Sequence, residues 1–320
     1  MKAIVVSEFG GPEVLVLKEK PDPTPEEGQV LVRIKAAGIN PVDTYQRAGG
    51  QGYNRPRPFT PGIDGAGTVE AIGDGVTKVA VGDDVYLAGS ATGTYAELCL
   101  ASADQVFPLP GSMSYEDGAC LWVNYGTAYR ALFQRGGARP GDRVLIHGGT
   151  GGVGVAALQW SLWRGLDVIT TYGSDGGRNM LEGLGATKVV DHKDTRHVAQ
   201  VLEMTGGTGV DVVAEMLANV NLDIDMDMVA SKGRIVVIGS RGSIEVTPRK
   251  LMGKEAEVRG LMLYGASPDE VAEIHAAIAA AGAAEALKPV VQARMTLAEA
   301  PDAHEAVMEN PSHGKIILTP

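Results

Sequence analysis

The feature that most constrains the fold is a regular alternation of short apolar runs and helix-forming stretches that begins near residue 123. The run RVLIH (143–147) is the first, and five more apolar runs follow at intervals of about 20–30 residues, each with a helix-forming stretch between it and the next. Strands and helices that alternate in this way form a doubly wound parallel sheet. The sequence therefore predicts a Rossmann-type domain over residues 123–264.

A glycine-rich loop, HGGTGGVG (147–154), follows the first predicted strand directly. Gly149, Gly151 and Gly154 have the spacing G-x-G-x-x-G, and a helix-forming stretch comes next. This order directs backbone N–H groups at the start of a helix toward a pyrophosphate. Alone, such a loop can be a turn that only packs a helix on a sheet. The strand and helix units that follow it favour a dinucleotide site.

The end of the second predicted strand indicates which dinucleotide is bound. Sites that prefer NAD place an acidic residue there to accept hydrogen bonds from the adenosine ribose. Here the strand ends in Thr171-Tyr172, Asp175 comes late, and Arg178 is nearby. A missing acid beside a cation suits a 2′-phosphate and predicts NADPH. Arg178 is alternatively a residue of a solvated helix face.

Residues 1–122 have a different texture, with short β-branched runs separated by glycine and proline turns. They predict a mostly antiparallel β domain. The tail, 265–320, is too short for a domain of its own and is expected to return to the first one. The predicted organisation is therefore 1–122 plus 265–320 as one domain and 123–264 as the other. A dinucleotide domain joined to a β domain, with a cleft between them, favours hydride transfer.

Composition excludes several other classes of protein. The net charge is −11, and no basic run offers a footprint for nucleic acid or for an anionic membrane. Residues 144–163 lack charged side chains over about the length of a membrane span. The glycines of the loop fall inside this stretch, so a buried strand, a turn and a helix explain it better. Cys99 and Cys120 form no C-x-x-C pair, which suits reduced thiols in a cytoplasmic protein.

The sequence does not predict a catalytic metal. None of the six histidines forms an H-x-H or H-x-x-x-H pair, and all follow the main stretch of the β domain. We therefore expect a site with no metal ligands.

Several stretches together carry a family resemblance. They are AAGINPVDTYQRAG (36–49), PGIDGAGTVEAIGDGV (61–76), NYGTAYRAL (124–132), HGGTGGVG (147–154), EMLANVNL (215–222) and VIGSRGSIEVTPR (237–249). The chain resembles the zinc-free, zeta-crystallin-like quinone oxidoreductases of the medium-chain dehydrogenase/reductase superfamily, over nearly its whole length. The resemblance implies a GroES-like catalytic domain beside a Rossmann NADPH-binding domain, and NADPH-dependent reduction of quinones.

The same resemblance accounts for the absent metal ligands. Zinc-binding relatives carry a cysteine where this chain has Asn40. They carry Gly-His-Glu where it has Gly62-Ile63-Asp64, and their four-cysteine lobe has no counterpart. Because the side chain of Ile63 cannot ligate a metal, the resemblance implies catalysis without zinc.

Three catalytic residues are carried over from the resemblance. Tyr45 is expected beside the nicotinamide or substrate, where its phenol would bind a quinone oxygen; alternatively it lies at a domain edge. Asn40 is expected against the nicotinamide riboside, although N-P-V-D also favours a helix start with Asp43 in the first turn. Thr127 is expected near the nicotinamide, or else it bonds to its own helical turn.

The cofactor-binding residues that the resemblance implies lie in the loop and at the ends of the later strands. Ligands bind in this fold at the carboxyl ends of the strands. The residues are Thr150, Gly151, Gly152, Val153, Gly173, Arg178, His192, Asn221, Ile238, Gly239, Ser240, Arg241, Leu261, Met262 and Leu263.

Rival functions remain open at this stage. The same fold can reduce the C=C bond of a 2-alkenal or enone, and a relative of this type can be a non-catalytic NADPH- or RNA-binding protein. The family likeness implies one-electron reduction of ortho-quinones. It also implies a homodimer or homotetramer that pairs through the run VRGLMLY (258–264), which we expect to be the last strand.

Overall fold

The computed structural model describes residues 1–50, 52–111, 113–309 and 312–320, which form two compact units. Unit 1 comprises Met1–Val123 and Pro289–Pro320, and unit 2 comprises Asn124–Lys288. Residues 51, 112, 310 and 311, which fall in the predicted first domain, lie outside the described residues.

Unit 1 is built on a mostly antiparallel sheet with the strand order β14-β15-β3-β4-β5-β7, in which β6 also pairs with β3. Among the described residues of this sheet, only β14 and β15 run parallel. A separate two-stranded sheet pairs β1 with β2. The elements are β1 (Lys2–Val5), β2 (Val16–Glu19), β3 (Gln29–Ile39), α1 (Pro41–Ala48), β4 (Asp64–Ile72), β5 (Asp84–Ala88), β6 (Leu98–Ser102), β7 (Val106–Pro108), α2 (Tyr115–Gly118), β14 (Val291–Thr296), α10 (Ala300–Ala306) and β15 (Lys315–Thr319).

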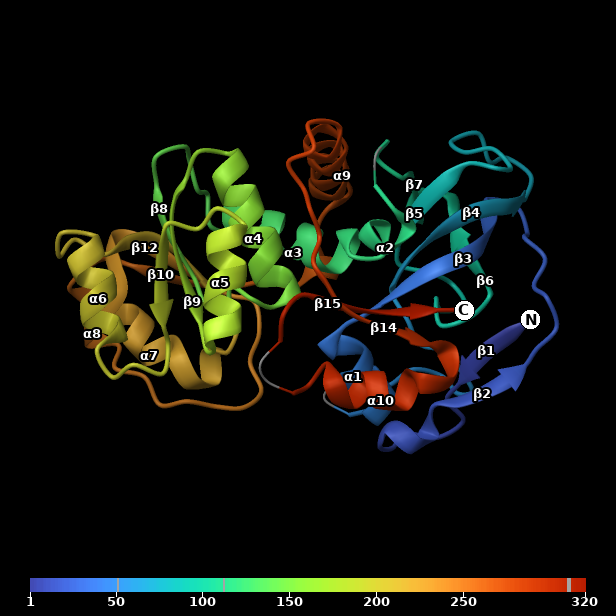
Figure 1. Cartoon of the computed structure of the whole chain (residues 1–320), viewed down its shortest axis with the longest axis horizontal. Helices are drawn as coiled ribbons and strands as arrows, with labels where there is room; N and C mark the ends of the chain where they lie inside the picture. The colour runs from blue at the N-terminus through green and yellow to red at the C-terminus, as the bar shows by residue number, and fades with distance from the viewer. Residues whose placement is uncertain (51, 112, 310–311) are drawn as a thin grey trace. The chain divides into compact units, whose positions relative to one another are not determined.

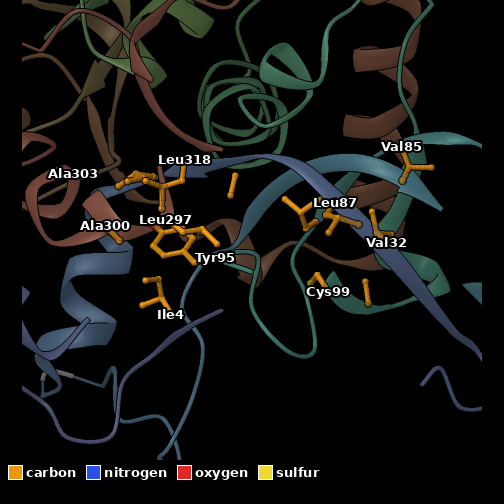
Figure 2. Close-up of a cluster of buried hydrophobic side chains, with 14 of the residues drawn as sticks. Ile4, Val32, Val85, Leu87, Tyr95, Cys99, Leu297, Ala300, Ala303 and Leu318 are labelled. Atoms are coloured by element: carbon orange, nitrogen blue, oxygen red, sulfur yellow. The ribbon is translucent and has the colours of Figure 1, made fainter. Parts of the chain in front are cut away.

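The core of unit 1 joins the two ends of the chain. Ile4 from β1 and Tyr95 pack in the same buried cluster as Leu297, Ala300 and Leu318 from the C-terminal tail (Figure 2). Apolar burial of this kind stabilises a fold by about 25 cal/mol for each Å² removed from water. The last part of the chain therefore completes the core of unit 1.

Unit 2 is a six-stranded parallel sheet with helices packed around it (Figure 1). The strand order is β10-β9-β8-β11-β12-β13, and every neighbouring pair runs parallel. The elements are α3 (Thr127–Tyr129), β8 (Arg143–Ile146), α4 (Gly152–Trp163), β9 (Asp167–Tyr172), α5 (Asp175–Gly183), β10 (Lys188–Asp191), α6 (His197–Met204), β11 (Val210–Glu215), α7 (Ala218–Met228), β12 (Val229–Val237), α8 (Arg249–Met252), β13 (Glu257–Gly260) and α9 (Pro268–Ala283).

This order confirms the doubly wound sheet. The chain runs outward from β8 to β10 on one side and from β11 to β13 on the other, so the direction of winding reverses between β8 and β11. In such sheets, ligands bind at the carboxyl ends of the strands near this reversal. The fold class expected from the sequence is therefore correct.

The uncharged stretch 144–163 forms β8, the glycine loop and α4. Val144, Leu145 and Ile146 are fully buried in the sheet, and Trp160 of α4 is fully buried as well. Its indole N–H donates to the Tyr125 carbonyl at 3.0 Å. Among the described residues, no helix combines the length and the apolar character that a membrane crossing needs.

The boundary between the units differs from the predicted one. Residues 265–288, expected in the β domain, belong to unit 2. The reason is α9, whose polar side chains bond to the segment around α3. The Tyr129 hydroxyl lies 2.8 Å from Glu273 Oε1, and Arg130 Nη1 lies 2.8 Å from Glu270 Oε1. Only Pro289–Pro320 returns to unit 1.

The last strand of unit 2 is shorter than the run 258–264 suggests. The strand β13 ends at Gly260, and the chain then turns through a short 3-10 helix over Leu263–Gly265. Leu263 is buried, but Met262 is 60% exposed. The expectation that 258–264 forms the last strand is therefore wrong beyond Gly260.

Candidate dinucleotide site and buried charge clusters

The glycine loop is fixed to the end of the neighbouring strand β9. The Gly148 N–H donates to Thr171 Oγ1 at 3.0 Å, and the Gly149 N–H donates to the Thr171 carbonyl at 2.9 Å. Gly148 has a φ of +59°, a backbone conformation that residues with a side chain rarely adopt. The loop therefore leaves β8 in one defined direction.

Close packing at the loop requires glycine. A Cβ on Gly149 would lie 1.9 Å from Thr170 Oγ1, and one on Gly154 would lie 2.2 Å from the Gly148 carbonyl oxygen. A Cβ on Gly152 would lie 2.4 Å from Asn124 Nδ2. Glycine at positions 149 and 154 therefore allows α4 to start directly against the loop.

The first turn of α4 presents backbone N–H groups. Gly151 is the N-cap, so the N–H groups of Gly152, Val153 and Gly154 have no partner within the helix. The buried Thr150 precedes the cap. Free N–H groups and the helix dipole favour an anion at this position. The predicted loop residues therefore fit the pyrophosphate of a dinucleotide.

Polar and cationic groups gather at the ends of β9 and β10. A Cβ on Gly173 would lie 2.7 Å from His192 Nε2, and Lys193 Nζ donates to the Gly173 carbonyl. No acidic residue ends β9, since Tyr172 is its last residue. The predicted Arg178 is exposed on α5, with its Nε 2.9 Å from Glu182 Oε1.

The loops after β11 and β12 are bonded to each other. The Ala218 N–H donates to the Gly239 carbonyl at 2.9 Å, and the Ile238 N–H donates to the Glu215 carbonyl at 2.8 Å. The Arg241 N–H donates to Asn219 Oδ1, and Ser240 Oγ lies 3.5 Å from the same oxygen.

The predicted residues of unit 2 follow six parallel strands. Because all these strands run in one direction, their carboxyl ends share one edge of the sheet. Leu261 follows β13 at this edge, and its N–H donates to the Val237 carbonyl at 3.0 Å. Thr127 is buried in α3, which packs against α4.

The two catalytic candidates of unit 1 have different surroundings. Tyr45 lies half-buried on α1, with its ring 5.8 Å from that of Tyr53. Its hydroxyl has no hydrogen-bond partner within the described part of the chain. Asn40 is the N-cap of α1 and is 1% exposed. Its N–H donates to Asp43 Oδ2 at 2.8 Å, which agrees with the alternative of a helix start.

A buried cluster of three ionisable side chains lies behind the loops of unit 2. His147 Nε2 lies 2.8 Å from Asp225 Oδ1 and 3.5 Å from Glu215 Oε2. Glu215 Oε1 accepts from the Leu217 N–H and from Asn221 Nδ2. The predicted cofactor residue Asn221 is therefore held by Glu215, and the cluster connects the glycine loop to the loop after β11.

Burial governs the protonation of this cluster. It raises the pKa of Glu215 and that of Asp225 to about 7, and it lowers the pKa of His147. The pair of carboxyl groups therefore retains a proton near neutral pH, while His147 is neutral.

Sequence reasoning missed several of these residues. Lys193 had a local signal, because it directly follows His192 at the end of a predicted strand. Glu215 and Asp225 had none, because a buried carboxyl pair is recognisable only when α7 is folded back along β11.

Comparisons with known proteins agree with this geometry. Residues 26–111 match the family model for the alcohol dehydrogenase GroES-like domain, and residues 152–291 match that for zinc-binding dehydrogenase. A quinone oxidoreductase of Rattus norvegicus is 41% identical over 99% of this chain and 97% of its own. The chain belongs to the quinone oxidoreductases of the medium-chain dehydrogenase/reductase superfamily. It is therefore an oxidoreductase.

Solved structures of this superfamily share the fold. The Escherichia coli quinone oxidoreductase complexed with NADPH is 30% identical, with a TM-score of 0.90 over the whole of both chains. A mycobacterial protein complexed with NADPH is 32% identical, with a TM-score of 0.91 and the same coverage.

The name of the second family model raises the question of zinc. Asn40 and Asp64 stand where zinc-binding relatives carry ligands, according to the motif comparison. In this structure Lys315 Nζ donates to Asn40 Oδ1 and lies 2.7 Å from Asp64 Oδ2. Ile63, between Gly62 and Asp64, offers no donor atom. An ammonium already engages both oxygens, so these residues do not fit a zinc ion.

The buried cluster predicts how stability changes with pH. Glu215 and Asp225 hold their proton more tightly when folded, so their contribution to stability is complete below the pKa of the unfolded carboxyls. It is lost as the pH rises toward about 7. Asp225→Asn should therefore reduce the fall in Tm between about pH 5 and about pH 8. Thermal unfolding across this range measures it.

Glu203→Gln is the matched control, since Glu203 is an exposed carboxylate of α6 paired with Arg196. It should leave the pH profile of Tm unchanged. Identical pH profiles for Asp225→Asn and the parent chain would contradict the assignment of the retained proton.

Proposed function

We propose that the chain is an NADPH-dependent quinone reductase that works without a metal. The observation that carries this proposal is the glycine loop at the start of α4, together with the neighbouring end of β9, which carries no acidic residue and has two cations nearby. Lys193 donates to the Gly173 carbonyl, and Arg178 lies one turn into the next helix, α5. These groups suit the 2′-phosphate that distinguishes NADPH from NADH.

In this proposal the backbone and side chains of unit 2 bind and orient the cofactor. The N–H groups of Gly152–Gly154 hold the pyrophosphate, and Asn221, fixed by Glu215, contacts the nicotinamide half. When bound, NADPH supplies the reducing equivalents. In this metal-free proposal, positioning of the acceptor supplies most of the rate.

Tyr45 is the proposed hydrogen-bond donor to the acceptor oxygen. Its phenol is half-buried on α1 and has no partner in the described residues, so it is available to a ligand. A donor aimed at developing oxygen charge takes over the role that a metal has in other dehydrogenases. Asn40 supports Tyr45 by starting the same helix, and Thr127 orients the nicotinamide.

The chain is also proposed to act as a homodimer or homotetramer, in the reducing environment of the cytoplasm. Its two cysteines are buried and free. The edge strand β13 and the segment after it expose apolar side chains, with Val258 at 38% and Met262 at 60%. A second copy of the chain would cover this edge. Light scattering should give at least twice the monomer mass, and a monomer at micromolar concentration would contradict the assembly.

The acceptor and the cofactor can be tested in one panel. NADPH and NADH are each combined with a planar ortho-quinone and with trans-2-hexenal, and oxidation of the nicotinamide is followed by absorbance. We expect turnover with NADPH and quinone, and a kcat/KM at least about tenfold lower with NADH, because the 2′-phosphate contacts are lost. Turnover with the alkenal alone would instead assign an enone reductase, and NADPH binding without turnover would assign a binding protein.

Tyr45→Phe tests the donor. We expect kcat with the quinone to fall about 10- to 100-fold, because one hydrogen bond to the developing charge is removed. The Kd for NADPH, measured by fluorescence titration, should not change. Tyr53→Phe is the matched control, because Tyr53 is the ring neighbour of Tyr45. A kcat unchanged in Tyr45→Phe would exclude the phenol from the reaction.

A further inference from the structure

Lys315 is a buried cation of unit 1. It is the first residue of β15, and its side chain is 3% exposed, while that of its partner Asp64 is 1% exposed. The stem of Lys315 runs against Gly38 of β3, where a Cβ would lie 2.6 Å from Lys315 Cε. Because a Cβ there would also lie 2.1 Å from the Ala119 carbonyl oxygen, this position beside the Lys315 stem requires glycine.

The ammonium closes a triangle of hydrogen bonds. Lys315 Nζ donates to Asn40 Oδ1 and to Asp64 Oδ2, the latter at 2.7 Å, and Asn40 Nδ2 donates to the same Asp64 oxygen at 3.1 Å. Asp64 Oδ1 accepts from the Val123 N–H at 3.0 Å. The starts of β4, β15 and α1, which are separate in sequence, therefore meet at one charge pair.

Stability alone is a weak reason for this arrangement. Burying two charges costs free energy that their attraction only partly offsets, and an apolar replacement of similar shape is often as stable. The triangle does determine the orientation of the Asn40 amide. Asn40 starts α1, the helix that carries Tyr45.

We propose that Lys315 is a positioning residue, whose ammonium orients Asn40 and Asp64 and thereby fixes the start of α1 and the place of Tyr45. The ammonium engages the two oxygens that a metal ion would need, so it acts as an internal cation of the β domain. Its catalytic consequence rests on the reductase function proposed above. Its structural consequence is a site that binds a primary ammonium, and this consequence does not depend on the reductase function.

Chemical rescue tests both consequences. Lys315→Ala removes the equivalent of one propylammonium, so added propylammonium should restore the ion pair with Asp64. We expect kcat for quinone reduction to fall about 10- to 100-fold in Lys315→Ala, with KM for NADPH within about twofold of the parent value. Propylammonium should recover part of kcat and raise the Tm of this variant in a saturable way. Tetramethylammonium, which has no N–H, should do neither.

Lys35→Ala is the matched control, because Lys35 is an exposed lysine of β3. It should keep the parent kcat and show no response to propylammonium. A Tm of Lys315→Ala that propylammonium does not raise would overturn the inference. If propylammonium raises the Tm of Lys315→Ala but the parent chain reduces no quinone, the proposed function is rejected and the ammonium site is retained.

A charge-balanced double variant covers the case in which Lys315→Ala does not fold. Asp64→Asn with Lys315→Met removes both charges and keeps the side-chain lengths, so it should fold. Its kcat should remain reduced, because the Asn40 amide loses its charged partner. A double variant that folds and keeps the parent kcat would also overturn the inference.

Discussion

All six strands of unit 2 run in one direction, and this constraint gathers the candidate cofactor site. Each strand contributes its carboxyl end to the same edge of the sheet, so residues more than one hundred positions apart in sequence lie along one line. The glycine loop follows β8, the cationic group follows β9 and β10, and the loop held by Glu215 follows β11. Changing the direction of one strand would remove its residues from the edge.

The parts of this site that could be predicted are those with local signals. HGGTGGVG has its strand, turn and helix within one short stretch, and the close packing of Gly149 and Gly154 explains why glycine occurs there. Contacts between distant segments gave no signal. Lys315 and Asp64 are separated by 251 positions, and nothing in either local sequence indicates a buried pair. An apolar run also misled the prediction of β13, because Met262 lies in an exposed turn after Gly260.

Buried charge has a different role in each unit. In unit 2, His147, Glu215 and Asp225 hold two loops together by hydrogen bonds and a retained proton. In unit 1, Lys315 neutralises Asp64 and orients Asn40. Burying the ionic groups of both clusters costs desolvation free energy, and apolar side chains of similar volume would fill the same space without that cost. In our account, the hydrogen bonds of these two clusters fix the positions of the groups that contact the cofactor and the acceptor.

The most direct test of this account is the zinc content of active protein. The chain is expressed with added zinc, purified, and measured by mass spectrometry for zinc per chain, alongside its rate of NADPH oxidation by an ortho-quinone. The account predicts full turnover at less than about 0.1 zinc per chain. About one zinc per chain, with turnover lost when a chelator removes it, would contradict the central claim.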